Sequence, residues 1–169
     1  MPAAVGSGEA RGFGHEIDGL RHLITELRPA ALDDLGLAAA LRSHLDRQAR
    51  VAGLASYFDA AEAPAEIAPE TETACFRVAQ EAITNVLRHA RARNVWVRLF
   101  DSGGRLALSV RDDGLGFDVE SVHGLGLAGM EERTALAGGS LELCAMPGKG
   151  TVVLATFPLD ADEAEQAFG

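Results

Sequence analysis

The sequence predicts an α+β fold in which a layer of helices packs on a mostly antiparallel sheet. The first observation is a set of segments whose apolar residues recur at three- and four-residue steps, as in amphipathic helices. The second is a set of short segments with alternating apolar and polar residues, separated by turn residues, as in hairpins. Helices and hairpins come in separate blocks, which is the pattern of α+β folds.

The helical prediction centres on residues 77–92, RVAQEAITNVLRHARA. One stripe of this segment is apolar and consists of Val78, Ala82, Ile83, Val86 and Ala90. Acidic residues in the first turn, after Pro69, suit the start of this helix because they complement its dipole. Other helices are predicted at 17–28, ended by Pro29, at 37–52, ended by Gly53, and from Gly124 to the glycines at 138–139.

Strands are predicted at 55–60, 94–100, 105–110, 140–146 and 151–158. The turn sequence DSGG separates the second and third of these, and PGKG separates the last two. Each of these two pairs is therefore expected to form a β-hairpin.

Composition and charge narrow the classes of function. The 169-residue chain is long enough for one domain with its own core. A net charge of −10 argues against binding nucleic acid or an anionic membrane through bulk electrostatics. No stretch resembles a membrane span or a signal peptide, so we expect a cytoplasmic fragment. Cys75 and Cys144 lie in apolar runs, which predicts buried free thiols rather than a disulfide or a metal site.

A second stripe of the central helix is polar. It contains Glu81, Asn85, Arg88 and His89, which a regular α-helix would direct the same way. A carboxylate can orient or deprotonate a hydroxyl group, an Asn carbonyl can bind Mg2+, and an Arg can meet phosphate oxygens. The stripe is either an ordinary polar surface or one wall of a binding site.

Two glycine clusters follow the central helix. DDGLGF (112–117) comes at a strand end and is either a plain turn or a loop that approaches a flat ring closely. The letters of 124–129 match G-x-G-x-x-G, and Glu142 lies 18 residues after Gly124, as a dinucleotide-binding motif would require. However, the preceding DVESVH is not a buried strand, so a phosphate-binding loop at a helix N-terminus is the better interpretation.

Four segments resemble, in the right order, the sequence boxes of the GHKL ATP-binding superfamily, which includes histidine kinases, Hsp90, DNA gyrase B and MutL. The similar segments are EAITNVLRHA (N box), DDGLGF (G1), HGLGLAGM (G2) and GKGT (the last glycine motif). Upstream, ELRPAALDDLGLAAAL resembles the dimerisation helix and linker of nitrate-sensor/DesK-like sensor histidine kinases. The resemblance covers 17–159 and implies the Bergerat/GHKL fold, a two-layer sandwich with helices on one face of a mixed, mostly antiparallel sheet.

The resemblance also implies ligands and residue roles. ATP would be the nucleotide, and Asn85 would be the Mg2+ ligand. Glu81 would polarise the attacking group, and Arg88 and His89 would lie by the phosphates. The remaining ATP-binding residues would be Asp112 at the adenine amine, Gly114 and Gly116 against the base, Gly124 and Gly126 in the lid, and Thr151 behind the adenine.

The chain divides, on this interpretation, into four parts: a disordered leader (1–14), a remnant of the second dimerisation helix with the linker and a first helix (15–53), the ATP-binding domain (54–160) and an acidic tail (161–169). His15 imitates the family's phosphoacceptor motif. It stands only 14 residues before Pro29, too few for a helical hairpin, so we expect another source for the acceptor. His22 and His44 are predicted on helix surfaces.

Three classes of function remain open. The favoured one is the catalytic domain of a two-component sensor histidine kinase, with a dimerisation helix and a response regulator as partners. The second is a serine kinase of the anti-sigma-factor type, which LRPAALDDLGL argues against. The third is a non-enzymatic ATP-binding module, which the presence of Glu81, Asn85 and Asp112 argues against.

Overall fold

The computed structural model describes residues 27–120, 124 and 126–160. The predicted leader, the predicted acidic tail and most of the predicted helix at 17–28 lie outside these residues, as do His15 and His22. Leu27 and Arg28, at the end of that predicted helix, are not helical. Pro29 contributes to this, because its ring disfavours the α conformation at the preceding residue.

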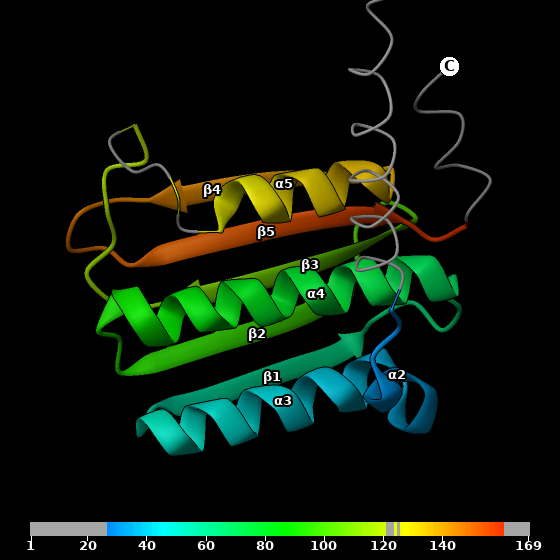
Figure 1. Cartoon of the computed structure of the whole chain (residues 1–169), viewed down its shortest axis with the longest axis horizontal. Coiled ribbons are helices and arrows are strands. Elements are labelled where there is room, and N and C mark those ends of the chain that lie inside the picture. Colours follow the sequence, from blue (N-terminus) through cyan, green and yellow to red (C-terminus); the bar gives the residue numbers. More distant parts are fainter. Residues whose placement is uncertain (1–26, 121–123, 125, 161–169) are drawn as a thin grey trace, which may run out of the picture.

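Five strands form one sheet in the order β1-β2-β3-β5-β4 (Figure 1). The strands are β1 (Ala55–Glu62), β2 (Asn94–Asp101), β3 (Arg105–Asp112), β4 (Ser140–Ala145) and β5 (Thr151–Pro158). β1 pairs with β2 in parallel, and the other three pairs are antiparallel. The predicted mixed, mostly antiparallel sheet is confirmed. The parallel pair needs a long crossover, which a helix between β1 and β2 supplies.

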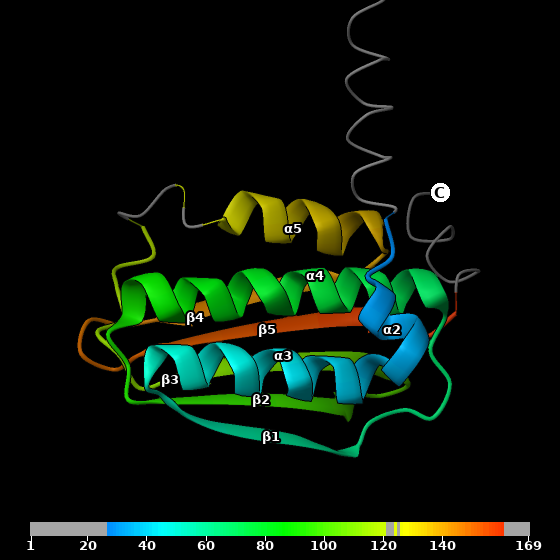
Figure 2. The same ribbon diagram turned by 60° about the horizontal axis from the view of Figure 1, so that its bottom comes forward.

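The helices are α2 (Ala30–Leu35), α3 (Leu37–Ala52), α4 (Pro69–Asn85) and α5 (Leu127–Leu136), and α4 continues into a π-helical turn, η1 (Val86–Ala90). Figures 1 and 2 show α3, α4 and α5 side by side over one face of the sheet, so the predicted two-layer α+β fold is confirmed. Among the described residues, no helix combines the length and the apolar character needed to cross a membrane.

The core fills the space between the two layers, with α4 in the middle. The predicted apolar stripe of α4 and η1 is buried throughout: Val78, Ala82, Ile83, Val86 and Ala90. Leu41 and Leu45 of α3 and Met130 of α5 are each 0 % exposed on either side of it. Along β2, every second residue is buried against the helices, as the alternation of a strand requires. The opposite face of the sheet has no helix over it among the described residues (Figure 2).

The central helix ends earlier than the sequence pattern predicts, at Ala90 rather than Ala92. Arg91 has a left-handed backbone with φ of 48°, which terminates the helix. The Ala90 carbonyl accepts a hydrogen bond from the Leu115 amide at 2.7 Å. This end of the helix is therefore tied to the DDGLGF loop, a contact that helical periodicity alone could not reveal.

Two burial predictions need correction. Cys75 is buried, but Cys144 is exposed, because the alternation of the edge strand β4 turns its side chain away from the helices. His44 is half-buried rather than on the surface, and its ring meets the Phe76 ring edge-on with centroids 5.9 Å apart. Burial lowers the pKa of His44, and the charge of Arg47 adds to this effect.

Candidate ATP-binding site

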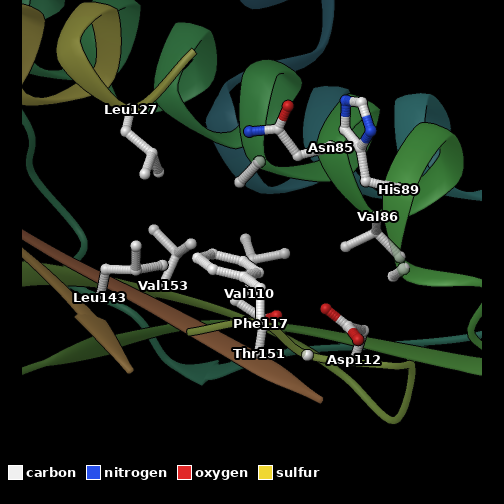
Figure 3. Close-up of a pocket in the computed structure, with 13 residues that line it drawn as sticks. Asn85, Val86, His89, Val110, Asp112, Phe117, Leu127, Leu143, Thr151 and Val153 are labelled. Atoms are coloured by element: carbon white, nitrogen blue, oxygen red, sulfur yellow. The ribbon is translucent and has the colours of Figure 1, made fainter. Parts of the chain in front are cut away.

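A pocket lies between the C-terminal end of α4 and the ends of β3 and β5 that face it (Figure 3). It encloses about 470 Å³, part of which is open to solvent. Its polar lining residues are Asn85, His89, Asp112 and Thr151. Residues from three segments that are distant in the sequence therefore meet at one place.

Asp112 is the buried carboxylate of this pocket, with a residue exposure of 3 %. Its Oδ1 accepts a hydrogen bond from the Gly114 amide at 2.8 Å, and the backbone and side chain of Thr151 also hydrogen-bond to it. Burial raises the pKa of Asp112 above its ordinary value, and the hydrogen bonds from Gly114 and Thr151 oppose this shift. A buried carboxylate has a strong need for further donors, which a ligand can supply.

Asp113, the next residue, has a different role. Its Oδ1 accepts the amides of Arg93 and Asn94 at 2.8 and 2.9 Å, and its Oδ2 accepts the Asn94 side-chain amide at 2.7 Å. These hydrogen bonds, led by those from Asn94, lower the pKa of Asp113 to about 2. Asp113 thus fixes the start of β2, while Asp112 faces the pocket.

The polar stripe of the central helix is only partly assembled at the pocket. Asn85 and His89 line it on the helix side, opposite Asp112 (Figure 3). Glu81 and Arg88 are not among its lining residues, and Arg88 is exposed. His89 is exposed as well, so exposure does not distinguish Arg88 from it, and the common direction of the four side chains stays a prediction. Residues 86–90 form a π-helical turn, which is wider than a regular α-helical turn.

The glycines of DDGLGF lie very close to neighbouring backbone. A Cβ on Gly114 would stand 2.1 Å from the Ala90 carbonyl oxygen. A Cβ on Gly116 would stand 2.0 Å from the Met146 carbonyl oxygen, and Gly116 also has a φ of +58°. Gly116 lines the pocket, whereas Gly114 does not. Both positions therefore need glycine for packing of the protein itself, in addition to any approach of a ring.

The second glycine cluster leads into α5. Gly126 has a φ of +68°, and a Cβ there would stand 2.0 Å from Oε1 of Glu81. The Glu81 carboxylate thus lies against the loop at the start of α5. Gly124 has a φ of +109° and no atom near its missing Cβ. Residues 121–123 and 125 are outside the described residues, so the path of this loop between the two glycines is not described.

Much of the pocket lining was not identified from the sequence. The apolar lining residues are Ala82, Val86, Ala90, Val110, Phe117, Leu127, Leu143 and Val153. Phe117 belongs to the DDGLGF segment, which could have suggested it. The others carry only the ordinary signal of core residues. Gly150, in GKGT, is a further position missed, since a Cβ on it would stand 2.1 Å from the Asp112 carbonyl oxygen.

Comparison with protein families identifies the class of protein to which this chain belongs. Residues 70–161 match the model of the family described as histidine kinase-, DNA gyrase B- and HSP90-like ATPases. The matched range contains every residue of the pocket. The chain belongs to this family of ATPases, and the resemblance to a GHKL catalytic domain of the sensor histidine kinase type is confirmed.

Individual relatives point the same way. The chain is 40 % identical over 148 residues to the sensor histidine kinase MctS of Rhizobium johnstonii, covering 85 % of this chain and 32 % of the relative. It is 36 % identical over 146 residues to the oxygen sensor histidine kinase NreB of Staphylococcus carnosus, covering 85 % and 42 %. The chain therefore spans less than half the length of either relative.

Solved structures share the fold at lower sequence identity. The histidine kinase domain of a blue-light activated histidine kinase from Erythrobacter litoralis superposes with a TM-score of 0.65 and 22 % identity, covering 78 % of this chain and 64 % of that one. The histidine kinase AdeS of Acinetobacter baumannii gives 0.61 and 16 %, covering 92 % and 87 %. These likenesses support the fold assignment alone.

Proposed function

We propose that this chain is the catalytic domain of a two-component sensor histidine kinase, which binds ATP with Mg2+ and transfers the γ-phosphate to a histidine on a dimerisation helix. From there the phosphoryl group would pass to an aspartate of a response regulator. The observation that supports this most directly is Asp112, a buried carboxylate in a mainly apolar pocket of a family of ATPases.

Recognition of the adenine would rest on Asp112 and the apolar lining. The exocyclic amine of adenine is a donor that the buried Asp112 carboxylate can accept in addition to those of Gly114 and Thr151. Val110, Val153 and Leu143 offer apolar surface to a flat ring. Phe117 is drawn among these side chains in Figure 3, so its ring shares the space in which a base would lie.

The residues present also fit Mg2+, with Asn85 as the protein ligand. Among the described residues there is no group of three or more His, Cys, Asp or Glu side chains that could hold a metal ion by itself. Mg2+ suits such a site, because it commonly takes one or two protein oxygen atoms and completes its shell with phosphates and water. When bound, it would neutralise charge on the phosphates. Asn85 would hold it through the side-chain carbonyl oxygen.

The phosphates would extend from the adenine toward the start of α5 and the end of α4. The N-terminus of α5 and the glycines before it can supply amide donors to phosphate oxygens. His89, which lines the pocket, would approach the phosphates directly, and Arg88, which does not line it, would reach them from the next position on the helix. Glu81 would orient the attacking imidazole, and catalysis would otherwise be positioning and charge stabilisation.

Phosphoryl transfer can be tested with radiolabelled ATP and a kinase-inactive partner that carries a dimerisation hairpin. We expect acid-labile label on the partner, as phosphohistidine gives. Glu81→Ala should reduce the rate of transfer more than it reduces ATP affinity. Acid-stable label would favour the serine-kinase alternative, and ATP binding without transfer to any matched hairpin would favour a binding module.

The metal contact can be tested by titrating ATP with and without Mg2+. Asn85→Ala should weaken binding in the presence of Mg2+ and leave metal-free binding nearly unchanged, because the substitution removes the proposed oxygen ligand of the metal. Equal losses in the two titrations would assign Asn85 a structural role instead.

A further inference from the structure

A groove runs between α3 and β1, at the edge of the sheet opposite β4. It encloses about 1600 Å³ when the space open to solvent is included. Figures 1 and 2 both show α3 lying along β1 at this edge. Its described lining has no residue in common with the lining of the pocket around Asp112. The groove is therefore a separate surface of the molecule.

The groove is basic, although the protein as a whole is acidic. The chain has 25 Asp and Glu residues against 15 Lys and Arg, yet Arg42, Arg47 and Arg50 all line this one groove. Arg42 stacks over the Phe58 ring at 5.1 Å, and Arg47 contacts the His44 ring at 3.5 Å. Within the described part of the chain, none of the three arginines forms an ion pair with a carboxylate. Their charges are available to an acidic ligand.

The two acidic residues of the groove are already engaged. Asp59 pairs with Arg98 at 3.3 Å and accepts the Ala61 amide at 3.0 Å. Asp46 accepts a hydrogen bond from the Ser56 hydroxyl at 3.3 Å. Arg98 is shared between Asp59 and Glu62, so the groove lining keeps an excess of positive charge from three arginines against two aspartates.

The outer edge of β1, which forms one wall of the groove, is a free strand edge among the described residues. β1 is the terminal strand of the sheet, and β2 is its only described partner. The Ala55 amide bonds to the Arg93 carbonyl on the β2 side. Since successive residues of a strand direct their backbone groups to opposite sides, Ser56 and Phe58 present theirs to the outer edge. The walls beside this edge include the small residues Ala38 and Ala60, so another backbone can come close.

We propose that this groove binds an acidic segment of a partner protein in extended conformation. The segment adds to β1 through the backbone groups of Ser56 and Phe58, as in β-strand addition. Its carboxylates pair with Arg47 and Arg50 on α3. A partner with the opposite charge fits because the groove is positive on a protein of net charge −10, which repels acidic chains elsewhere on its surface.

The test uses a short fluorescein-labelled peptide of alternating Glu and Val as the probe, with fluorescence anisotropy as the readout. Binding should be measurable at low salt and absent for the same peptide with Lys in place of Glu. The double variant Arg47→Glu, Arg50→Glu should weaken binding by about tenfold or more. Failure of the unchanged protein to bind the Glu peptide, or equal binding by the double variant, would overturn the proposal.

A matched control separates the groove from the overall charge. Arg50→Glu and Lys149→Glu change the net charge equally, but Lys149 is an exposed residue of the turn between β4 and β5. Arg50→Glu should weaken peptide binding and Lys149→Glu should not. Equal losses in these two variants would show that bulk charge, not the groove, attracts the peptide. ATP affinity and thermal stability measured on the same samples verify that the groove variants are folded.

Strand addition has its own readout in amide hydrogen exchange. The Ser56 and Phe58 amides should exchange more slowly when the peptide is bound, while the Tyr57 amide, on the β2 side, should change little. Protection of α3 without protection of Ser56 and Phe58 would contradict strand addition. Tighter peptide binding after removal of residues 161–169 would identify the chain's own tail as the occupant. Dimers that dissociate in the double variant would identify a second copy, and either result would overturn the proposal of a partner.

Discussion

The two ends of α4 carry polar side chains of similar kinds, but they use them differently. At the N-terminal end, Arg28 meets Glu72 and Asp33 at 2.6 Å each, and Thr71 donates to the Pro158 carbonyl at 2.9 Å. At the C-terminal end, Asn85 and His89 line a pocket opposite the buried Asp112. Side chains at the first end satisfy one another and so stabilise the fold, whereas those at the second face a space that a ligand can enter.

The backbone differs between the two ends in the same sense. The first end is a regular α-helix that begins at Pro69, a residue suited to the first helical turn. The second end passes into a π-helical turn and stops at Arg91 in a left-handed conformation. Its last carbonyl, that of Ala90, is held by the loop that contains Gly114. Irregular backbone is therefore found at the end of α4 that lines the pocket, whereas the opposite end is a regular helix that stabilises the fold.

Gly114→Ala is expected to change stability most, because it adds a side chain where the DDGLGF loop contacts the C-terminal end of the central helix. The new Cβ would lie 2.1 Å from the Ala90 carbonyl oxygen, so backbone must shift. We expect the free energy of unfolding to fall by about 3 kcal/mol, as measured by urea denaturation. Gly104→Ala is the control: its φ of +82° is strained, but no atom lies within 4 Å. It should cost only about 1 kcal/mol. Similar losses for the two variants would contradict the importance of the Ala90 contact.

Asp112→Asn tests whether the carboxylate that faces the pocket binds the adenine base of ATP. An amide at this position would pair poorly with the adenine amine, so ATP affinity should fall by about 1–3 kcal/mol in calorimetry. Asp113→Asn provides the neighbouring comparison, because Asp113 hydrogen-bonds to Arg93 and Asn94 outside the pocket. This second variant should bind ATP with unchanged affinity. If both variants bound as well as the unchanged protein, the adenine would not be recognised at Asp112.

Arg28→Ala tests the opposite end of α4. The substitution removes hydrogen bonds to Asp33, Glu72, the Pro69 carbonyl and Thr73, and leaves the largely buried Glu72 side chain without this partner. The free energy of unfolding should fall by about 1–2 kcal/mol, discounted for the partial exposure of these groups. ATP affinity should stay the same. A loss of ATP affinity as large as that of Asp112→Asn would show that the two ends are not independent.

The smallest expected change in stability is its dependence on pH through the half-buried His44. Burial lowers the pKa of His44 in the folded state, so the folded protein favours the neutral ring. The associated stability is complete above the unfolded-state pKa of about 6.5 and is lost as the pH falls from there toward the lower folded-state pKa. As the pH falls below about 6.5, the free energy of unfolding should therefore fall more steeply than in His44→Gln, as measured by denaturation at a series of pH values. Parallel pH profiles for the two proteins would rule out this contribution.

The order of the main elements and the apolar stripe of α4 could be predicted from sequence patterns, whereas the mixed sheet was implied by the family resemblance. Their signals are local, since periodicity, prolines and glycines act within a few residues of the backbone that they shape. The assignment of DDGLGF and GKGT to one binding site was also possible from the sequence, because both segments resemble sequence boxes of the GHKL superfamily. The sequence alone led to both Asp112 and Thr151, and the register of β3 with β5 places them opposite each other.

Only the tertiary structure decided which of these residues share a site, and how. It separated Asp112 from Asp113 by burying one and binding the other to Asn94, although the letters are identical. It ended the central helix in a π-helical turn that no apolar periodicity encodes. It placed Cys144 on the exposed face of the edge strand β4, and it half-buried His44 against Phe76, a residue of a distant segment. Burial and contact depend on what the rest of the chain brings to a residue, and local sequence carries no record of that.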